Sequence, residues 1–428
     1  MELNAFVTRC LRHTTAYLEA VEAAAGEGRL TNEQGVPVKP SFPSMLLICQ
    51  TETHFAAELL GSSPDLPQPL QLVKKSLPSP TNLLGQMEAG GASSIDVAPG
   101  VGGVALSRLA LLGKRDVDLF TRRYPEAAEL YRTALIFDGT LASDDAFNAL
   151  RFSPESLDIW LNDVLTMNTW RGQVRARYFQ SFWMIERKCS SSELQRRLNR
   201  HHPIGGPEVT LTMRSDRPTL TTVRRAANFA SLAAVDKIGE TTLTKFLELN
   251  EDILKVTLGA ERLIGQPLRP WREGNSDPHE VAIQPDFLFV DRAGEVHICE
   301  VKLPLLKRTS LTKGRHKRRE FISPVSEGIS QLGNYADYFS RASHRQLIEE
   351  RFKVTVADPR MVLIVGSAEN YDHQQALEAS RMLKAFELLD YDSVRALYLA
   401  QSGYTPGVEV SSGLAGLSSR VPAHGDHA

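Results

Sequence analysis

The chain has 428 residues, more than one hydrophobic core usually organises, so we expect two or three domains. A net charge of −2, with 23% charged and 42% hydrophobic residues, is ordinary for a soluble protein, so any nucleic-acid-binding surface must be local. Four widely spaced cysteines argue against a zinc ribbon or disulfide framework and fit a reducing cytoplasm, and no apolar run is long enough to span a membrane.

The first half of the chain, residues 1–225, predicts a mainly helical domain with a regulatory or sensing role. Its first segment, residues 3–25, carries an apolar stripe at helical spacing and is followed by Gly26, a typical helix end. A stretch rich in Pro, Gly and Ser near residues 61–103 predicts long loops with one or two short elements.

Helical signals return between residues 116 and 198. There Ser153-Pro154-Glu155 offers the cap, first-turn proline and acid of a helix that would continue through Leu157, Trp160 and Leu161. The segment from Trp170 to Arg200 interleaves basic and aromatic residues. Such residues can hold a phosphate backbone and stack bases, but aromatic residues at helical spacing more often pack in a core. His201-His202 has no third ligand at metal spacing and is expected at the surface. A domain boundary is predicted near 205–232.

The second domain is expected to open with an amphipathic helix over residues 240–255. Its apolar face consists of Leu243, Phe246, Leu247 and Leu254. Glu240 lies close to that face, so its side chain could reach a site beside the packed helix. A solvated first-turn glutamate favoured by the helix dipole explains the pattern nearly as well.

The strongest signal is a β-hairpin that carries acidic residues among apolar ones. Two apolar runs, residues 287–290 and 296–301, flank a three-residue loop that ends in Gly294, a common connection with that glycine left-handed. Pairing outward from this loop places Asp286 opposite Glu300. Because apolar residues occupy both faces, we expect the hairpin inside a sheet covered by helices.

Asp286, Glu300 and Lys302 share one face at one end of this strand pair, because side chains alternate along a strand. Burying such charges without partners is costly, and a hard divalent cation compensates the carboxylates most simply. The two carboxylates and the carbonyl of Val301 are suited to Mg²⁺, with Mn²⁺ able to substitute. Lys302 can hold the attacking water or offset charge on the phosphate, which predicts phosphodiester hydrolysis. An ordinary ion pair between Glu300 and Lys302 is the alternative.

Pro285-Asp286 and Glu300-Val301-Lys302 resemble the two elements of the PD-(D/E)XK nuclease superfamily. The resemblance implies a mixed α/β sheet flanked by helices, of the restriction-endonuclease type. The surrounding residues, about 232–402, are similar to the nuclease domain of Shedu anti-phage defence proteins. The matching positions are Glu240, Leu243, Phe246-Leu247 and Asn250 upstream, and Gln331-Leu332-x-x-Tyr335, RMVLIVGS and LLDYDSVRALYL downstream.

This resemblance implies that Glu240 and Gln331 belong to the active site, although Gln331 could also be a glutamine at a packing edge. It further implies an Mg²⁺-dependent DNA endonuclease, a homo-oligomer of four chains, that defends bacteria and responds to a phage-derived trigger. Two alternatives stay open: a repair or restriction-type nuclease with the same core, and a nucleic-acid-binding protein on this fold that no longer cuts.

A run of seven cations directly follows the proposed catalytic strand. Charge runs are usually solvated. Because this run lies next to a predicted phosphate-cleaving site, contact with the DNA backbone is as strong an expectation as simple solvation. The residues are Lys307, Arg308, Lys313, Arg315, Lys317, Arg318 and Arg319. Farther on, residues 371–389 predict an amphipathic helix, and the tail over 403–428 is expected to be disordered.

Overall fold

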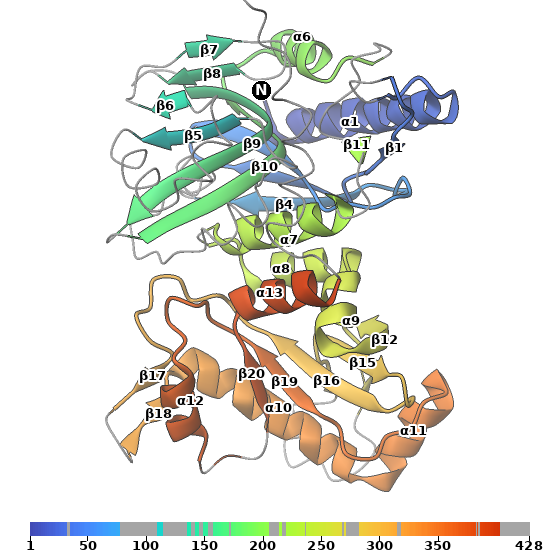
Figure 1. Ribbon diagram of the computed structural model, residues 1–428, viewed down its shortest axis with the longest axis vertical. Coiled ribbons are helices and arrows are strands. Elements are labelled where there is room, and N and C mark those ends of the chain that lie inside the picture. Colours follow the sequence, from blue (N-terminus) through green and yellow to red (C-terminus); the bar gives the residue numbers. More distant parts are fainter. Residues whose placement is uncertain are drawn as a thin grey trace, which may run out of the picture.

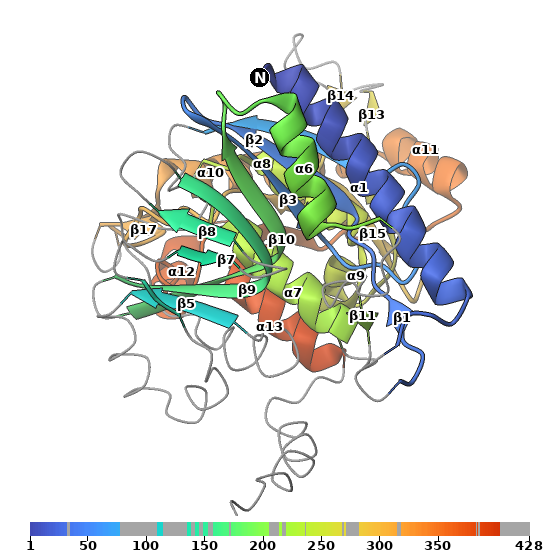
Figure 2. The same cartoon turned by 90° about the horizontal axis from the view of Figure 1, so that it is seen from above.

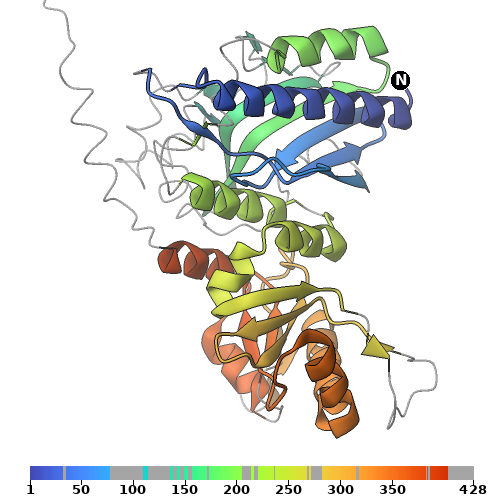
Figure 3. The same cartoon turned by 90° about the vertical axis from the view of Figure 1, so that its right-hand side faces the viewer.

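A computed structural model gives the fold of most of the chain. It describes residues 1–31, 35–77, 109–113, 135–137, 142–144, 149–152, 157–170, 173–204, 214–215, 220–235, 237–267, 269–270, 282–314, 318–381, 383 and 386–402. Side chains are described in these ranges except at 109–159, 163–177, 214–220 and 269–270. The predicted tail at 403–428 lies outside them. Two sheets alternate with layers of helices along the long axis of the molecule (Figure 1, Figure 3).

The outermost layer consists of α1 (Leu3–Gly26) and α6 (Ser191–His201), which lie side by side on the first sheet (Figure 2). The predicted first helix is therefore confirmed. The strands of this sheet are β2 (Met45–Gln50), β3 (His54–Leu60), β4 (Gln71–Ser76), β5 (Leu109–Gly113), β6 (Leu135–Phe137), β7 (Ala142–Asp144), β8 (Ala149–Phe152), β9 (Leu157–Trp170) and β10 (Gln173–Glu186). Their order is β4-β2-β3-β10-β9-β5-β6, with β8 joining β7 to β9. A short ladder pairs β1 (Lys39–Pro40) with β11 (Arg214–Ser215).

The prediction of a mainly helical first half is wrong. Leu157, Trp160 and Leu161, expected in a helix, lie in β9, while Ser153-Pro154-Glu155 lies outside the described residues. The two 14-residue strands β9 and β10 pair antiparallel over most of their length. Helices cover both faces of this sheet, so its apolar residues need not alternate, and their local spacing can imitate a helix.

Four helices form the middle layer: α7 (Leu220–Ala233), α8 (Glu240–Leu249), α9 (Asp252–Leu258) and α13 (Tyr391–Gln401). The helix predicted over 240–255 is broken at Asn250, whose side-chain amide donates to Ser44 Oγ at 3.0 Å and to the Phe246 carbonyl at 2.9 Å. One hydrophobic core runs through this layer, from Leu47 on β2 to Phe287. Val223, Phe229 and Leu232, which lie in the described part of the predicted boundary at 205–232, belong to this core.

The second sheet comprises β12 (Ala260–Gly265), β15 (Phe287–Asp291), β16 (Val296–Val301), β19 (Met361–Ile364) and β20 (Glu387–Leu389), in that order. Its first two pairs are antiparallel and its last two parallel, so a mixed α/β fold with helix-covered sheets is confirmed. The outer helices are α10 (Ser323–Ser340), α11 (Ala342–Phe352) and α12 (His373–Ser380). Two short ladders pair β13 (Arg269–Pro270) with β14 (Ala282–Ile283), and β17 (Thr312–Lys313) with β18 (Glu320–Phe321).

The amphipathic helix predicted over 371–389 is shorter than expected. Among the described residues of this range only α12 is helical, and Glu387–Leu389 instead forms β20 at the edge of the second sheet. The last strand is stabilised by pairing with β19, a contact that local periodicity does not report. Among the helices that the structure describes, none combines the length and apolarity needed to cross a membrane.

Candidate active site

β15 and β16 form the predicted hairpin in the predicted register. Val290 lies opposite Val296, and Leu288 lies opposite Ile298. Gly294 closes the loop at φ +82°, in the left-handed region that favours glycine. Because β16 also pairs with β19, the hairpin occupies the middle of the sheet, and its faces pack on α10 and on the middle helices.

Asp286 and Glu300 meet just beyond the last residue pair of this hairpin. The Val301 N–H donates to Oδ2 of Asp286 at 2.9 Å, and the Asp286 N–H donates to Oε2 of Glu300 at 3.4 Å. Glu300 is only 4% exposed and Asp286 is half-buried. Two carboxylates therefore lie together at a strand end where solvent can stabilise them only weakly.

Lys302 and Glu240 complete a four-residue charged cluster. The Lys302 ammonium lies 3.0 Å from Oε1 of Glu300 and 3.7 Å from Oε2 of Glu240. Glu240 is the first residue of α8, and its side chain remains partly exposed. The structure therefore brings together Asp286, Glu300, Lys302 and Glu240, which are 62 residues apart at the extremes (302 − 240).

Helix α10 lies across the same strand end. A Cβ added to Gly328 would lie 3.3 Å from Cγ of Lys302, and the hydroxyl of Tyr335 donates to Oε2 of Glu300 at 3.4 Å. Gln331 falls between them at helical spacing on this face. Its Oε1 is buried and, in the part of the chain that the structure describes, has no hydrogen-bond partner. From the sequence, Tyr335 was predicted only as part of the matching helix motif, without a role at the site, although its position four residues after Gln331 puts the two on one helix face.

Burial and mutual repulsion perturb the ionisation of these groups. Burial, followed by the charge of Glu300, raises the pKa of Asp286 to about 7. Burial also raises the pKa of Glu300, against the opposing effect of Lys302. Burial acts to lower the pKa of Lys302, but the nearby carboxylates outweigh it and raise that pKa, so this side chain is an ammonium.

The donor set fits a divalent cation. Three carboxylates face one ammonium, which leaves an excess of negative charge in a largely buried place. Hard cations such as Mg²⁺ prefer carboxylate, carbonyl and amide oxygens, and the orphaned Oε1 of Gln331 adds an acceptor. Asp286, Glu300 and the Val301 carbonyl are the residues that would hold such an ion.

We expect the metal-free protein to gain stability as the pH falls. Between its ordinary value of 3.8 and about 7, Asp286 binds a proton in the folded state that it does not bind in the unfolded chain. In EDTA, Asp286→Asn should therefore be more stable than wild type at about pH 8.5, by roughly 3 kcal/mol, and this gap should shrink toward pH 5. Urea unfolding across this pH range measures it. If the difference in unfolding free energy between the two proteins did not change with pH, burial would not destabilise the charged form of Asp286.

A second acidic cluster, at the turn of the hairpin, has a structural explanation. Asp291, Glu295 and His297 place their ligand atoms close together. Nδ1 of His297 accepts the Arg360 N–H at 3.1 Å, so Nε2 carries the proton that it donates to Asp291 at 3.3 Å. Backbone N–H donors, chiefly that of Glu295, lower the pKa of Asp291. These hydrogen bonds fix the turn.

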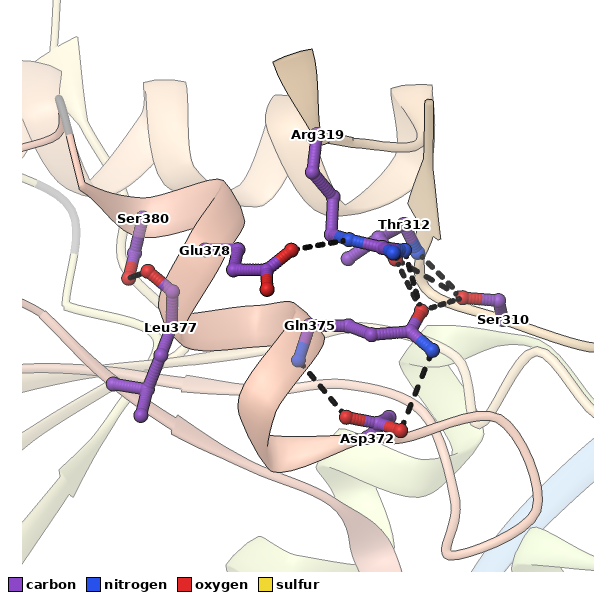
Figure 4. A network of polar contacts seen from close by, with 8 residues as sticks. All are labelled: Ser310, Thr312, Arg319, Asp372, Gln375, Leu377, Glu378 and Ser380. Atoms are coloured by element: carbon purple, nitrogen blue, oxygen red, sulfur yellow. Dashed lines mark hydrogen bonds and ion pairs between the residues drawn. The ribbon is translucent and has the colours of Figure 1, made fainter. Parts of the chain in front are cut away.

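The basic run after β16 does not form one uniform surface. Arg319 is mostly buried and donates to Glu378 on α12 at 2.9 Å, to Oε1 of Gln375 at 2.8 Å and to Oγ1 of Thr312 at 3.2 Å (Figure 4). Through this network α12 holds the β17 and β18 ladder. The other described cations of the run are exposed: Lys307, Arg308, Lys313 (paired with Glu320 at 3.2 Å) and Arg318. Arg315 and Lys317 lie outside the described residues.

The segment from Trp170 to Arg200 has its described aromatic side chains in the core. Tyr178, Phe179, Phe182 and Trp183 are buried, which favours the packing interpretation over base stacking. The prediction that His201 and His202 lie at the surface is wrong. His201 stacks on Trp160 at 4.6 Å between ring centroids, and Nε2 of His202 lies 2.8 Å from Oγ of Ser181. Both pack where α6 ends against the sheet, a contact that the sequence spacing did not report.

The fold and this cluster define an α/β protein with a buried carboxylate-rich site at the end of its central hairpin. Residues 238–394 match the family described as Shedu protein SduA, C-terminal. The resemblance to Shedu proteins is thereby confirmed over a segment that contains every residue of the cluster. No curated protein matches the chain.

Proposed function

We propose that this chain is a metal-dependent deoxyribonuclease of PD-(D/E)XK type that acts in anti-phage defence. The observation that carries the proposal is the cluster of Asp286, Glu300 and Lys302 at the buried end of a helix-covered hairpin. The family match suggests the defensive role. As part of the same proposal we place the protein in the cytoplasm and expect a homo-oligomer, a tetramer by resemblance, with a phage-derived trigger.

Each residue of the cluster has a distinct role in this proposal. Asp286, Glu300 and the Val301 carbonyl would hold Mg²⁺, or Mn²⁺ in its place, which supplies an activated water and charge stabilisation at the phosphate. Lys302, an ammonium, donates hydrogen bonds to the attacking water or to a phosphate oxygen as negative charge develops. Tyr335 orients Glu300, Glu240 restrains Lys302, and the free Oε1 of Gln331 accepts a hydrogen bond from the water.

The requirement for metal tests this proposal. Supercoiled plasmid and linear duplex should be cut in Mg²⁺ or Mn²⁺ and remain intact in EDTA, and both substrates together separate internal from terminal cutting. Metal added back after chelation should restore the activity. Cleavage that continues undiminished in EDTA would contradict a metal-dependent mechanism.

We also propose that Lys307, Arg308, Lys313, Arg315, Lys317 and Arg318 contact DNA phosphates, whereas Arg319 anchors the segment. Each phosphate contact contributes about −0.9 to the slope of log affinity against log salt. The triple change of Arg315, Lys317 and Arg318 to Gln should therefore flatten that slope by roughly two to three units, evenly across DNA sequences.

Arg319→Gln is the matched control. It removes one cation from the same run but breaks a partly buried network, so it should lower the free energy of unfolding by about 1–3 kcal/mol and leave the salt slope unchanged. Fluorescence anisotropy with duplex DNA and denaturant unfolding measure the two quantities. An unchanged slope in the triple variant would show that the run is merely solvated.

A further inference from the structure

The carbonyl of Lys302 is held by a side chain rather than by the sheet. β16 ends at Val301, and the Lys302 N–H still donates to the Ile364 carbonyl at 2.8 Å. The Lys302 carbonyl instead accepts the hydroxyl of Tyr391, the first residue of α13, at 2.8 Å. Tyr391 is 4% exposed, so this hydrogen bond is shielded from water.

The ring of Tyr391 extends this contact to the middle helical layer. It stacks on Phe229 of α7, with 5.3 Å between ring centroids and 22° between the planes. Phe229 is fully buried and also stacks on Phe246 of α8, the helix that begins at Glu240. Tyr391 therefore contacts both the backbone of the proposed catalytic lysine and a helix outside the second sheet.

Helix α7 is in turn fixed to the first sheet by buried polar contacts. The hydroxyl of Ser231 accepts the Tyr178 N–H at 2.7 Å and donates to the Tyr178 carbonyl at 3.0 Å. The side-chain amide of Asn228 donates to Oε1 of Gln180 at 3.2 Å. Both partners lie on β10, so a displacement of that strand would be transmitted to the α7 residues on either side of Phe229.

We infer that Tyr391 is a positioning residue: its hydroxyl fixes the backbone of Lys302, and its ring makes that position depend on how α7 sits on the first sheet. The effect on the cleavage rate rests on the proposed nuclease function. The positioning of the Lys302 backbone by Tyr391 does not. It assigns the first half of the chain a physical means of controlling the site, through β10, Phe229 and Tyr391.

Tyr391→Phe tests this inference, because it removes only the hydroxyl. The matched control is Tyr338→Phe, which removes the hydroxyl of a fully buried tyrosine on α10. This tyrosine stacks on His344 of α11, at the end of α10 remote from Gly328 and Lys302. Hydrogen exchange of a peptide that covers residues 298–306 reports the position of the strand end without any need for catalysis. Tyr391→Phe should lose protection there, and Tyr338→Phe should not. In single-turnover reactions Tyr391→Phe should cut about 10- to 100-fold more slowly, with DNA affinity within about twofold of wild type.

Phe229→Leu tests the connection to the first sheet. It should raise exchange in the same peptide, and it should have little further effect in a Tyr391→Phe background, because the two residues act in series. Wild-type exchange in Tyr391→Phe, or equal losses in Tyr391→Phe and Tyr338→Phe, would overturn the inference. If the wild-type protein cuts no DNA, the nuclease proposal fails, and the exchange measurements still decide whether Tyr391 positions Lys302.

Discussion

Asp286→Asn, Glu300→Gln and Lys302→Gln are each expected to reduce DNA cleavage by roughly a thousandfold or more while the protein stays folded. The first two changes remove a carboxylate charge that would hold the cation, and the third removes the ammonium that lies 3.0 Å from Glu300. In Asp286→Asn and Glu300→Gln the folded state should survive, because removing one of two neighbouring buried carboxylates relieves their repulsion. Lys302→Gln leaves Glu300 without its ammonium, but that carboxyl can take up a proton, because burial already raises its pKa. Single-turnover cleavage of linear duplex in Mg²⁺, alongside thermal unfolding, measures both effects.

Glu295→Gln provides a matched control for these variants. It neutralises a carboxylate of the same hairpin at its turn, away from the charged cluster. It should cut at the wild-type rate. Equal losses in Glu295→Gln and Glu300→Gln would mean that the hairpin is only sensitive to charge, and that Glu300 has no special place in the chemistry.

Removing the first half of the chain is expected to destroy the fold of the second. A fragment that starts at residue 228 cuts through α7 and strips the first sheet from a core shared by Phe229, Leu232 and Phe246. Exposing each large apolar side chain costs about 1.5–3 kcal/mol, and several of them together match the 5–15 kcal/mol that stabilises a typical protein. The fragment over 228–402 should therefore lack a cooperative thermal transition.

The comparison for this fragment is a chain over residues 1–402, which retains every described layer and should unfold like the full chain. Circular dichroism melting curves of the two proteins decide the matter. A fragment over 228–402 that melts cooperatively near the full chain, and cuts DNA, would show that the first half only regulates an independent domain.

The local parts of the fold were predictable because their signals are local. The register of Val290 with Val296 follows from the loop length, its glycine and the two-residue alternation of strands. That register alone brought Asp286 beside Glu300. The helix that carries Glu240 was predictable from the Shedu resemblance, which is confirmed over 238–394, and this helix places Glu240 next to Lys302.

The remaining features depend on contacts between distant residues. Leu157, Trp160 and Leu161 have helical spacing, but pairing with β8 at Leu157 and with β10 at Trp160 and Leu161 makes them a strand. Tyr391 follows a predicted helix end in sequence, and nothing in its neighbours indicates that it contacts Lys302, 89 residues earlier. Arg319 sits within a run of cations, and only the fold shows Glu378 and Gln375 on α12 beside it.

The most direct test of the central claim compares wild type and the Asp286→Asn, Glu300→Gln double variant on supercoiled plasmid in Mg²⁺. Both proteins should be purified in parallel, so that a contaminating nuclease would appear equally in each. We predict that wild type converts the plasmid to nicked or linear DNA and that the double variant leaves it supercoiled while binding it. Equal cleavage by the two proteins, or none by wild type in Mg²⁺ or Mn²⁺, would contradict a metal-dependent nuclease site at Asp286 and Glu300.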